Sequence, residues 1–114
     1  MTLIYKIVPE TLWREAEIAG SFTGAPIDLA DGYIHFSTAA QMRETAAKYF
    51  AGQEGLLLAA IDAEALGEAL RYEVSRGGDL FPHLYLPLDL AHVVFVETLP
   101  LGPDGAHRFP ERAV

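Results

Sequence analysis

Short apolar runs separated by turn residues dominate the pattern along the chain. Residues 2–8 alternate with apolar side chains on both sides, which predicts an interior strand. Residues 56–61 form a continuous apolar run after Gly55 and predict a buried strand. With three further runs, at 33–36, 70–75 and 93–99, the pattern predicts about five strands.

Two segments repeat their apolar residues at helical spacing and predict the two principal helices. The first begins after Pro9, a residue suited to a first helical turn, and is stopped by Gly20. The second opens at Thr38, because Gln41 three residues later completes a capping-box pattern. Gly52 is expected to end this second helix.

The remaining segments complete an α+β architecture. Trp13 and Tyr49 sit at helical spacing with other apolar residues and are predicted to lie in the core. Residues 21–29 contain glycine and proline and predict a loop, while Asp62 can cap a short helical turn. Strands and helices do not alternate strictly in the second half, and no linker divides the chain, so we expect one α+β domain over residues 1–114.

Composition narrows the classes of function. Sixteen acidic against eight basic side chains give a formal charge of −8, which disfavours non-specific binding of DNA or RNA. Cysteine is absent, which excludes disulfides and thiolate chemistry. Apolar runs are too short for a signal peptide or a membrane span, so we expect a cytoplasmic protein that does not enter membranes. The oligomeric state stays open.

His35 is the first candidate for chemistry. In its strand, Tyr33, His35 and Ser37 share one face, next to the start of the helix at Thr38. Free N–H groups at a helix start favour anions, so this polar face suits an anion or a sugar. The alternative is a histidine bonded to a backbone carbonyl, with Ser37 and Thr38 acting only as caps.

Glu73 is the second candidate and shares a strand face with Arg71. A carboxylate here can accept a hydroxyl hydrogen bond or stabilise a developing cation. Arg76, followed by Gly77 and Gly78, suits a phosphate contact or a mobile loop. The alternative is a solvated ion pair beside an ordinary turn.

His83 is the third candidate, within the segment Phe81-Pro82-His83-Leu84-Tyr85. Two aromatic rings, a stiffening proline and an imidazole make a wall for a planar ligand, although the same composition describes an ordinary packed loop. His35, Glu73 and His83 have the ligand types of a zinc or iron site, but no short metal-binding spacing occurs, and we predict no metal. Walker and dinucleotide fingerprints are absent, and Ser37 lacks the motif of a serine nucleophile.

Four segments taken together resemble a known family of bacterial and plant proteins, domain of unknown function 952. They are Ile4-Tyr5-Lys6-Ile7, Gly32-Tyr33-Ile34-His35-Phe36-Ser37-Thr38 with Gln41, Tyr72-Glu73, and Phe81-Pro82-His83-Leu84-Tyr85. The resemblance extends over nearly the whole chain, from Leu3 to about Pro110. Its most specific parts are the second and fourth segments.

The resemblance implies a compact ADP-ribosyltransferase-like fold, in which a split pair of small sheets cradles NAD. In the pattern of that fold, a first-strand histidine contacts a ribose, a second-strand aromatic packs on nicotinamide, and a later glutamate contacts the reacting ribose. Lys6 stands at the first-strand position in place of histidine. Tyr33 or His35 matches the second-strand position, and Glu73 matches the carboxylate.

Three hypotheses for function follow. The first is a transferase or hydrolase acting on NAD or a related nucleotide, with Glu73 stabilising a cationic transition state and His35 and His83 orienting ribose or phosphate. NAD is the possible substrate, and no other cofactor is indicated. Its ligand-binding set is Tyr5, Lys6, Tyr33, Ser37, Thr38, Arg71, Arg76, Phe81 and Tyr85. The second hypothesis is a non-catalytic module for a small nucleotide-like ligand, and the third is a protein-interaction domain.

Overall fold

The computed structural model describes residues 1–113, apart from the side chain of Arg76. Its helices are α1 (Glu10–Ala19), α2 (Pro26–Asp31) and α3 (Met42–Tyr49). Short 3₁₀ turns are η1 (Glu64–Ala69), η2 (Arg76–Gly78), η3 (Leu90–His92) and η4 (Glu111–Ala113). The strands are β1 (Leu3–Pro9), β2 (Ser21–Phe22), β3 (Ile34–His35), β4 (Ser37–Thr38), β5 (Leu56–Asp62), β6 (Leu70–Val74), β7 (Leu80–Leu84), β8 (Leu88–Asp89) and β9 (Val93–Thr98).

The central sheet has the strand order β4-β1-β5-β9 and is antiparallel throughout. β1 and β5 pair along their full length, from Leu3 opposite Asp62 to Pro9 opposite Leu56. The interior strand predicted at 2–8 and the buried strand predicted at 56–61 are confirmed. Both strands are apolar on their two sides because helices and loops cover both faces of this sheet.

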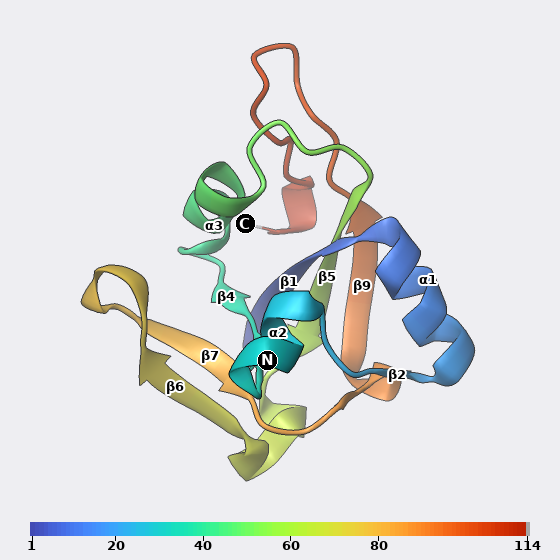
Figure 1. Cartoon of the computed structure of the whole chain (residues 1–114), viewed down its shortest axis with the longest axis vertical. Coiled ribbons are helices and arrows are strands. Elements are labelled where there is room, and N and C mark those ends of the chain that lie inside the picture. The colour runs from blue at the N-terminus through green and yellow to red at the C-terminus, as the bar shows by residue number, and fades with distance from the viewer. Residues whose placement is uncertain (114) are drawn as a thin grey trace.

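The two faces of β1 enter two separate core clusters. Ile4 and Val8 pack with Trp13 of α1 in the first cluster. Tyr5 and Ile7 point to the other face and pack in the second cluster, which also holds Met42 of α3. Figure 1 shows α1 and α3 on opposite sides of the β1–β5–β9 strands. Because successive side chains of a strand point to opposite faces, α1 and α3 pack against different faces of β1.

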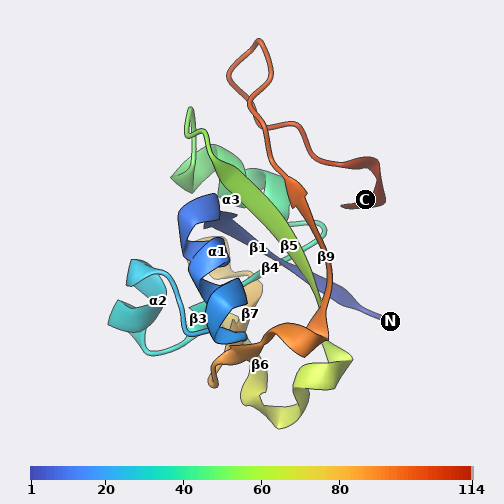
Figure 2. The same ribbon diagram turned by 90° about the vertical axis from the view of Figure 1, so that its right-hand side faces the viewer.

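A second sheet, with the order β3-β7-β6, is joined to the first through one residue. β3 pairs with β7 and β4 pairs with β1, and only Phe36 separates β3 from β4. The N–H of Phe36 donates to the carbonyl oxygen of Pro82 at 2.9 Å, which keeps the crossing segment on β7. Figure 2, turned by 90°, shows this change of sheet beside α2. A two-stranded pair, β2-β8, completes the sheets of the described residues.

Several local expectations were wrong, while the α+β class is confirmed. Residues 21–29 are no simple loop, since β2 lies there and α2 begins at Pro26. The second principal helix begins at Met42 and ends at Tyr49, and Gln41 bonds back to the N–H of Thr38 at 3.0 Å in the turn before it. Tyr49 is 60% exposed and does not lie in the core, because it is the last residue of α3, beyond the buried positions Met42 and Ala46.

β6 confirms the strand predicted at 70–75, but its apolar side chains are not well buried. Tyr72 and Val74 are 45% and 70% exposed, and Leu70 is half-buried. The reason is that β6 is the outer strand of the β3-β7-β6 sheet and has a neighbour on one edge only. No helix among residues 1–113 has the length and apolar character needed to cross a membrane.

The core can be tested with Leu58, which lies at the centre of β5 and is fully buried. Replacement of Leu58 by alanine leaves a cavity, and we expect the free energy of unfolding to fall by about 2–5 kcal/mol. Ile18, on α1, is 90% exposed, and Ile18→Ala should change it by less than about 0.5 kcal/mol. Urea unfolding of both variants is the measurement. Equal losses would contradict the assignment of β5 to the core.

Candidate functional site

The three-stranded sheet brings the predicted residues to one face. His35 lies opposite His83, and His83 lies opposite Arg71, so the three residues form one row across β3, β7 and β6. Glu73 follows Arg71 by two residues and points to the same side. The imidazole rings of His35 and His83 are 5.4 Å apart between centroids. The structure therefore brings His35, Glu73 and His83 together, from segments that are far apart in sequence.

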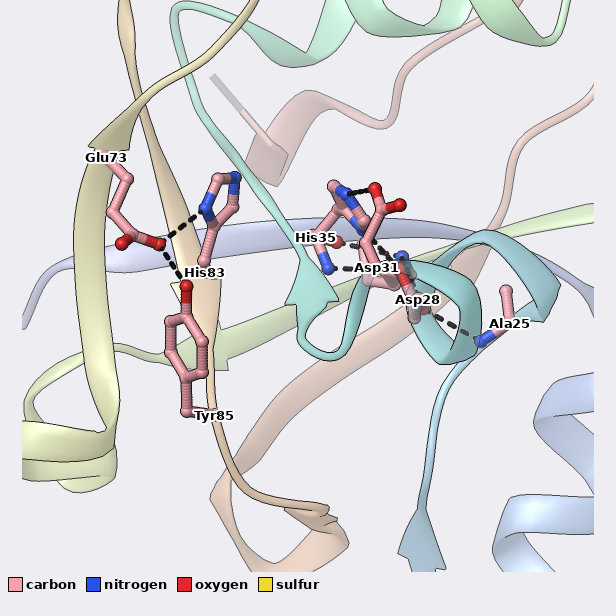
Figure 3. A network of polar contacts seen from close by, with 8 residues as sticks. Ala25, Asp28, Asp31, His35, Glu73, His83 and Tyr85 are labelled. Atoms are coloured by element: carbon pink, nitrogen blue, oxygen red, sulfur yellow. Dashed lines mark hydrogen bonds and ion pairs between the residues drawn. The ribbon is translucent and has the colours of Figure 1, made fainter.

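Glu73 is held by two hydrogen bonds to one of its oxygens. His83 Nδ1 lies 2.9 Å and the Tyr85 hydroxyl 2.7 Å from Glu73 Oε1 (Figure 3). The hydrogen bonds from Tyr85 and then His83 lower the pKa of the Glu73 carboxyl below its usual value, because they favour the charged form. Oε2 has no hydrogen-bond partner among the described side chains, which do not include that of Arg76. The site thus contains an ionised carboxylate with one oxygen available.

His83 is oriented by the same contact. Its side chain is 3% exposed, and an Nδ1–H bond to Glu73 leaves Nε2 as the acceptor nitrogen of the neutral ring. In Figure 3 the Nε2 edge of His83 points away from Glu73, toward the side of the face that holds His35. No described residue bonds Nε2. A carboxylate that fixes the tautomer of a buried histidine is an arrangement that acid–base catalysis uses.

Aromatic rings surround the two polar groups. The Tyr33 ring stacks on His83, with centroids 4.1 Å apart and an interplanar angle of 28°. Tyr33 also lies 5.2 Å from Tyr85, and the guanidinium of Arg71 lies 4.9 Å above the Tyr85 ring. Flat rings with a cation beside them suit a planar ligand that carries negative charge.

His35 differs from His83 because both of its ring nitrogens already have partners. Nδ1 is 2.7 Å from Asp28 Oδ1, and Nε2 is 3.0 Å from Asp31 Oδ2. Only the doubly protonated imidazolium can donate to both oxygens. His35 therefore packs at the edge of the site with its hydrogen-bonding capacity used. This leaves the partly exposed Glu73 carboxylate as the group open to a ligand, with the buried His83 beside it.

Asp28 and Asp31 were missed by the sequence analysis. Both belong to α2, in or next to the segment that was predicted as a loop. The signal that could have found α2 is Pro26 in its first turn with Asp28 two residues later, a pattern of helix starts. Asp28 is 2% exposed, so it is a buried carboxylate that requires partners.

Lys6 supplies the main partner of Asp28. Its ammonium lies 3.0 Å from both carboxylate oxygens and donates to the carbonyl oxygen of His35 at 2.8 Å. Burial alone would raise the pKa of the Asp28 carboxyl, but the bond from His35, the charge of Lys6 and two backbone N–H donors outweigh it and lower this pKa to about 2. Burial lowers the pKa of the Lys6 ammonium, and Asp28 opposes that shift. The pair lies beneath the face, so a ligand role of Lys6 stays a prediction without a supporting contact.

Among the other predicted ligand residues, Tyr5 and Ser37 belong to the central sheet and do not lie on this face, so the ligand role predicted for them was wrong. Tyr5 is buried in the second core cluster against Phe95, and the Ser37 hydroxyl bonds that of Thr45 at 2.9 Å. Thr38 and Phe81 line a neighbouring hollow of about 410 Å³. The side chain of Arg76 lies outside the described part of the structure.

The face itself is open and holds no metal cluster. The residues that line the 410 Å³ hollow, and those of a second hollow of about 610 Å³, do not include His35, Glu73 or His83. Within residues 1–113, no group of three or more histidine, aspartate or glutamate side chains is arranged to hold a metal ion.

Comparison with known proteins assigns the family. Residues 7–96 match the family described as "Protein of unknown function (DUF952)". The chain belongs to the DUF952 family. No curated protein matches it.

Solved structures of one relative share the fold over nearly the whole chain. The X-ray crystal structure of protein CC0527 from Caulobacter crescentus is 48% identical and covers 98% of both chains, with a TM-score of 0.93. A crystal structure of a double mutant of the same protein is 47% identical, also with a TM-score of 0.93, at 98% coverage of both chains. Its solution NMR structure is 52% identical over 93% of this chain and 91% of that one, with a TM-score of 0.84.

The buried ion pair of this DUF952 chain gives a stability prediction. Asp28→Asn leaves the ammonium of Lys6 buried without a counter-ion, and we expect the free energy of unfolding to fall by about 3–5 kcal/mol. Glu10→Gln is the matched control, because Glu10 pairs with Arg14 at the surface and its loss should cost less than about 1 kcal/mol. Urea unfolding at neutral pH measures both.

The same pair sets a pH dependence. The folded-state pKa of Asp28, about 2, lies below its ordinary value of 3.8. The stabilisation is therefore fully present above about pH 4 and is lost as pH falls toward about 2, because the unfolded chain then binds the proton more readily. Unfolding of Asp28→Asn should lack this component of the acid dependence. A variant that follows the parent's curve throughout that range would contradict the assignment.

Proposed function

We propose that this DUF952 chain binds NAD or a related nucleotide on the face of the β3-β7-β6 sheet and acts on it as a transferase or hydrolase. The observation that supports the proposal is Glu73, an ionised carboxylate with one open oxygen, fixed by His83 and Tyr85 beside stacked rings. An ADP-ribosyltransferase-like reaction is the form that fits these groups.

Each group on the face recognises a different part of such a ligand. Tyr33 and Tyr85 offer ring surface to a base or to nicotinamide, and Arg71 lies beside them to meet a phosphate. Glu73 Oε2 accepts a ribose hydroxyl. In a chain of net charge −8, Arg71 supplies the local positive charge that a phosphate needs.

The same groups suit cleavage of an N-glycosidic bond. As nicotinamide leaves with the bonding electron pair, the ribose develops oxocarbenium character, which the Glu73 carboxylate stabilises. Water or an acceptor hydroxyl then forms the new bond to the ribose carbon and gives its proton to His83 Nε2. Glu73 keeps the Nδ1–H of His83 in place, so that Nε2 is the nitrogen that accepts.

The test is Glu73→Gln with NAD. We expect calorimetry to detect NAD binding to the parent, and nicotinamide release to fall by about a hundredfold in Glu73→Gln, because the amide cannot stabilise the cation. Glu54→Gln is the matched control, since Glu54 is an exposed glutamate in the loop before β5. No heat with NAD, ADP-ribose or nicotinamide would contradict the proposal.

A non-catalytic binding module is the second candidate, and His35 favours it. Both ring nitrogens of His35 are bonded to aspartates, so only one of the two histidines has a nitrogen available for proton transfer. This candidate predicts NAD binding without nicotinamide release in the parent and in Glu73→Gln alike. The enzyme predicts release by the parent only.

A further inference from the structure

A hollow of about 610 Å³ lies between α3 and the loop formed by residues 104–109. Its walls come from Arg43, Ala46 and Ala47 of α3, Ala51 beyond it, and the 104–109 loop. No residue of β3, β6 or β7 contributes. Both ribbon views place this orange-red loop at the end of the molecule away from β6 (Figures 1 and 2). The volume falls within the range of small-molecule sites.

Two arginines in this hollow stand out by their lack of close carboxylates. Four other cations of the described chain pair with an acid at 3.2 Å or less, in the pairs Lys6–Asp28, Arg14–Glu10, Lys48–Glu44 and Arg112–Glu97, while Arg71 lies over the ring of Tyr85. Arg43 has no ion pair among residues 1–113. Arg108 has only Asp104, at 4.0 Å. The chain has twice as many acidic as basic side chains, which already keep it charged. A need for solubility therefore does not explain two such arginines at one hollow.

Both guanidinium groups are nevertheless held in place, by neutral partners. Arg43 lies over the ring of Phe109 with its guanidinium carbon 4.9 Å from the centroid. Arg108 lies against Gly102, where a Cβ atom would come within 2.1 Å of the Arg108 Nε. Gly102 has no positive φ, so its backbone does not require glycine. Glycine at position 102 therefore leaves the space that the Arg108 guanidinium occupies.

Backbone bonds make the loop a defined wall of the hollow. Gly102 N–H donates to the Ala106 carbonyl at 2.7 Å, and Arg108 N–H donates to the Pro100 carbonyl at 2.8 Å. His107 Nε2 bonds the Gln53 carbonyl at 2.8 Å, which ties the loop to the segment after α3. The backbone that carries Arg108 thus has little freedom left to lose on binding.

We propose that this hollow binds a small phosphomonoester. The phosphate lies between Arg43 and Arg108, whose planar guanidinium groups suit its oxygens. The organic part of the ligand lies on the alanines of α3 and on Phe109, which are short or flat and leave room for a ring. This site is separate from the face of Glu73 and His83 and does not depend on the function proposed for that face.

The test is an NMR titration of the whole chain with phenyl phosphate. We expect the amide signals of Ala46, Ala47, Gly105 and Ala106 to shift. Arg43→Gln and Arg108→Gln should each weaken binding by about tenfold or more, because each removes a hydrogen bond between charged groups. Lys48→Gln, which removes a charge from the same helix outside the hollow, should bind like the parent.

A further variant tests the position of the Arg108 guanidinium separately from its charge. Gly102→Ala removes no charge, yet it should weaken phenyl phosphate binding, because the added Cβ displaces the Arg108 guanidinium. Dispersed NMR spectra of each variant verify folding. The proposal is overturned if phenyl phosphate shifts only amides of β6 and β7, if both arginine variants bind it as the parent does, or if benzoate binds as tightly as phenyl phosphate.

Discussion

The buried ion pair between Lys6 and Asp28 is the interaction on which the arrangement of the two larger sheets depends. Lys6 comes from β1 of the central sheet, and its ammonium also donates to the carbonyl of His35 in the second sheet. Asp28 accepts from the backbone N–H and the ring of His35. Two charges taken out of water are tolerated only with such partners, so β1, α2 and β3 must keep their relative positions.

The pairing register of β3, β7 and β6 then determines the geometry of the face that holds His35, Glu73 and His83. The position of β3 fixes His35, and His35 lies opposite His83 on β7. β6 then lies against β7 and brings Glu73 within 2.9 Å of His83. A slip of one residue in either pairing would turn these side chains to the opposite face. The open oxygen of Glu73 and Nε2 of His83 are thus placed by backbone pairing more than by their own contacts.

The sequence predicts those parts of the fold in which the local pattern and the final environment agree. β1 and β5 were predictable because their side chains are apolar on both faces and both faces are buried. The meeting of His35, Glu73 and His83 was also predicted. α2 was missed because Gly24 and Pro26 indicate a loop, although Pro26 begins a helix.

Other features depend on partners that no local pattern reveals. Lys6 was expected to face a ligand, yet its counter-ion lies 22 positions away in the chain. His35 was expected either to contact a ligand or to bond a backbone carbonyl, because Asp28 and Asp31 become its partners only when α2 packs against β3. Tyr49 follows the helical spacing of apolar residues, but that spacing does not show how far along the helix the buried surface extends.

The tautomer of His83 tests the central claim most directly, because it reports whether Glu73 directs this ring toward a ligand. Long-range ¹H–¹⁵N NMR of the imidazole nitrogens distinguishes a protonated from an unprotonated nitrogen. The account predicts a protonated Nδ1 and an unprotonated Nε2 in His83, with the Nε2 signal moving on addition of NAD while that of His107 stays in place. A protonated Nε2 with a bare Nδ1, or an Nε2 signal that ignores NAD, would contradict it.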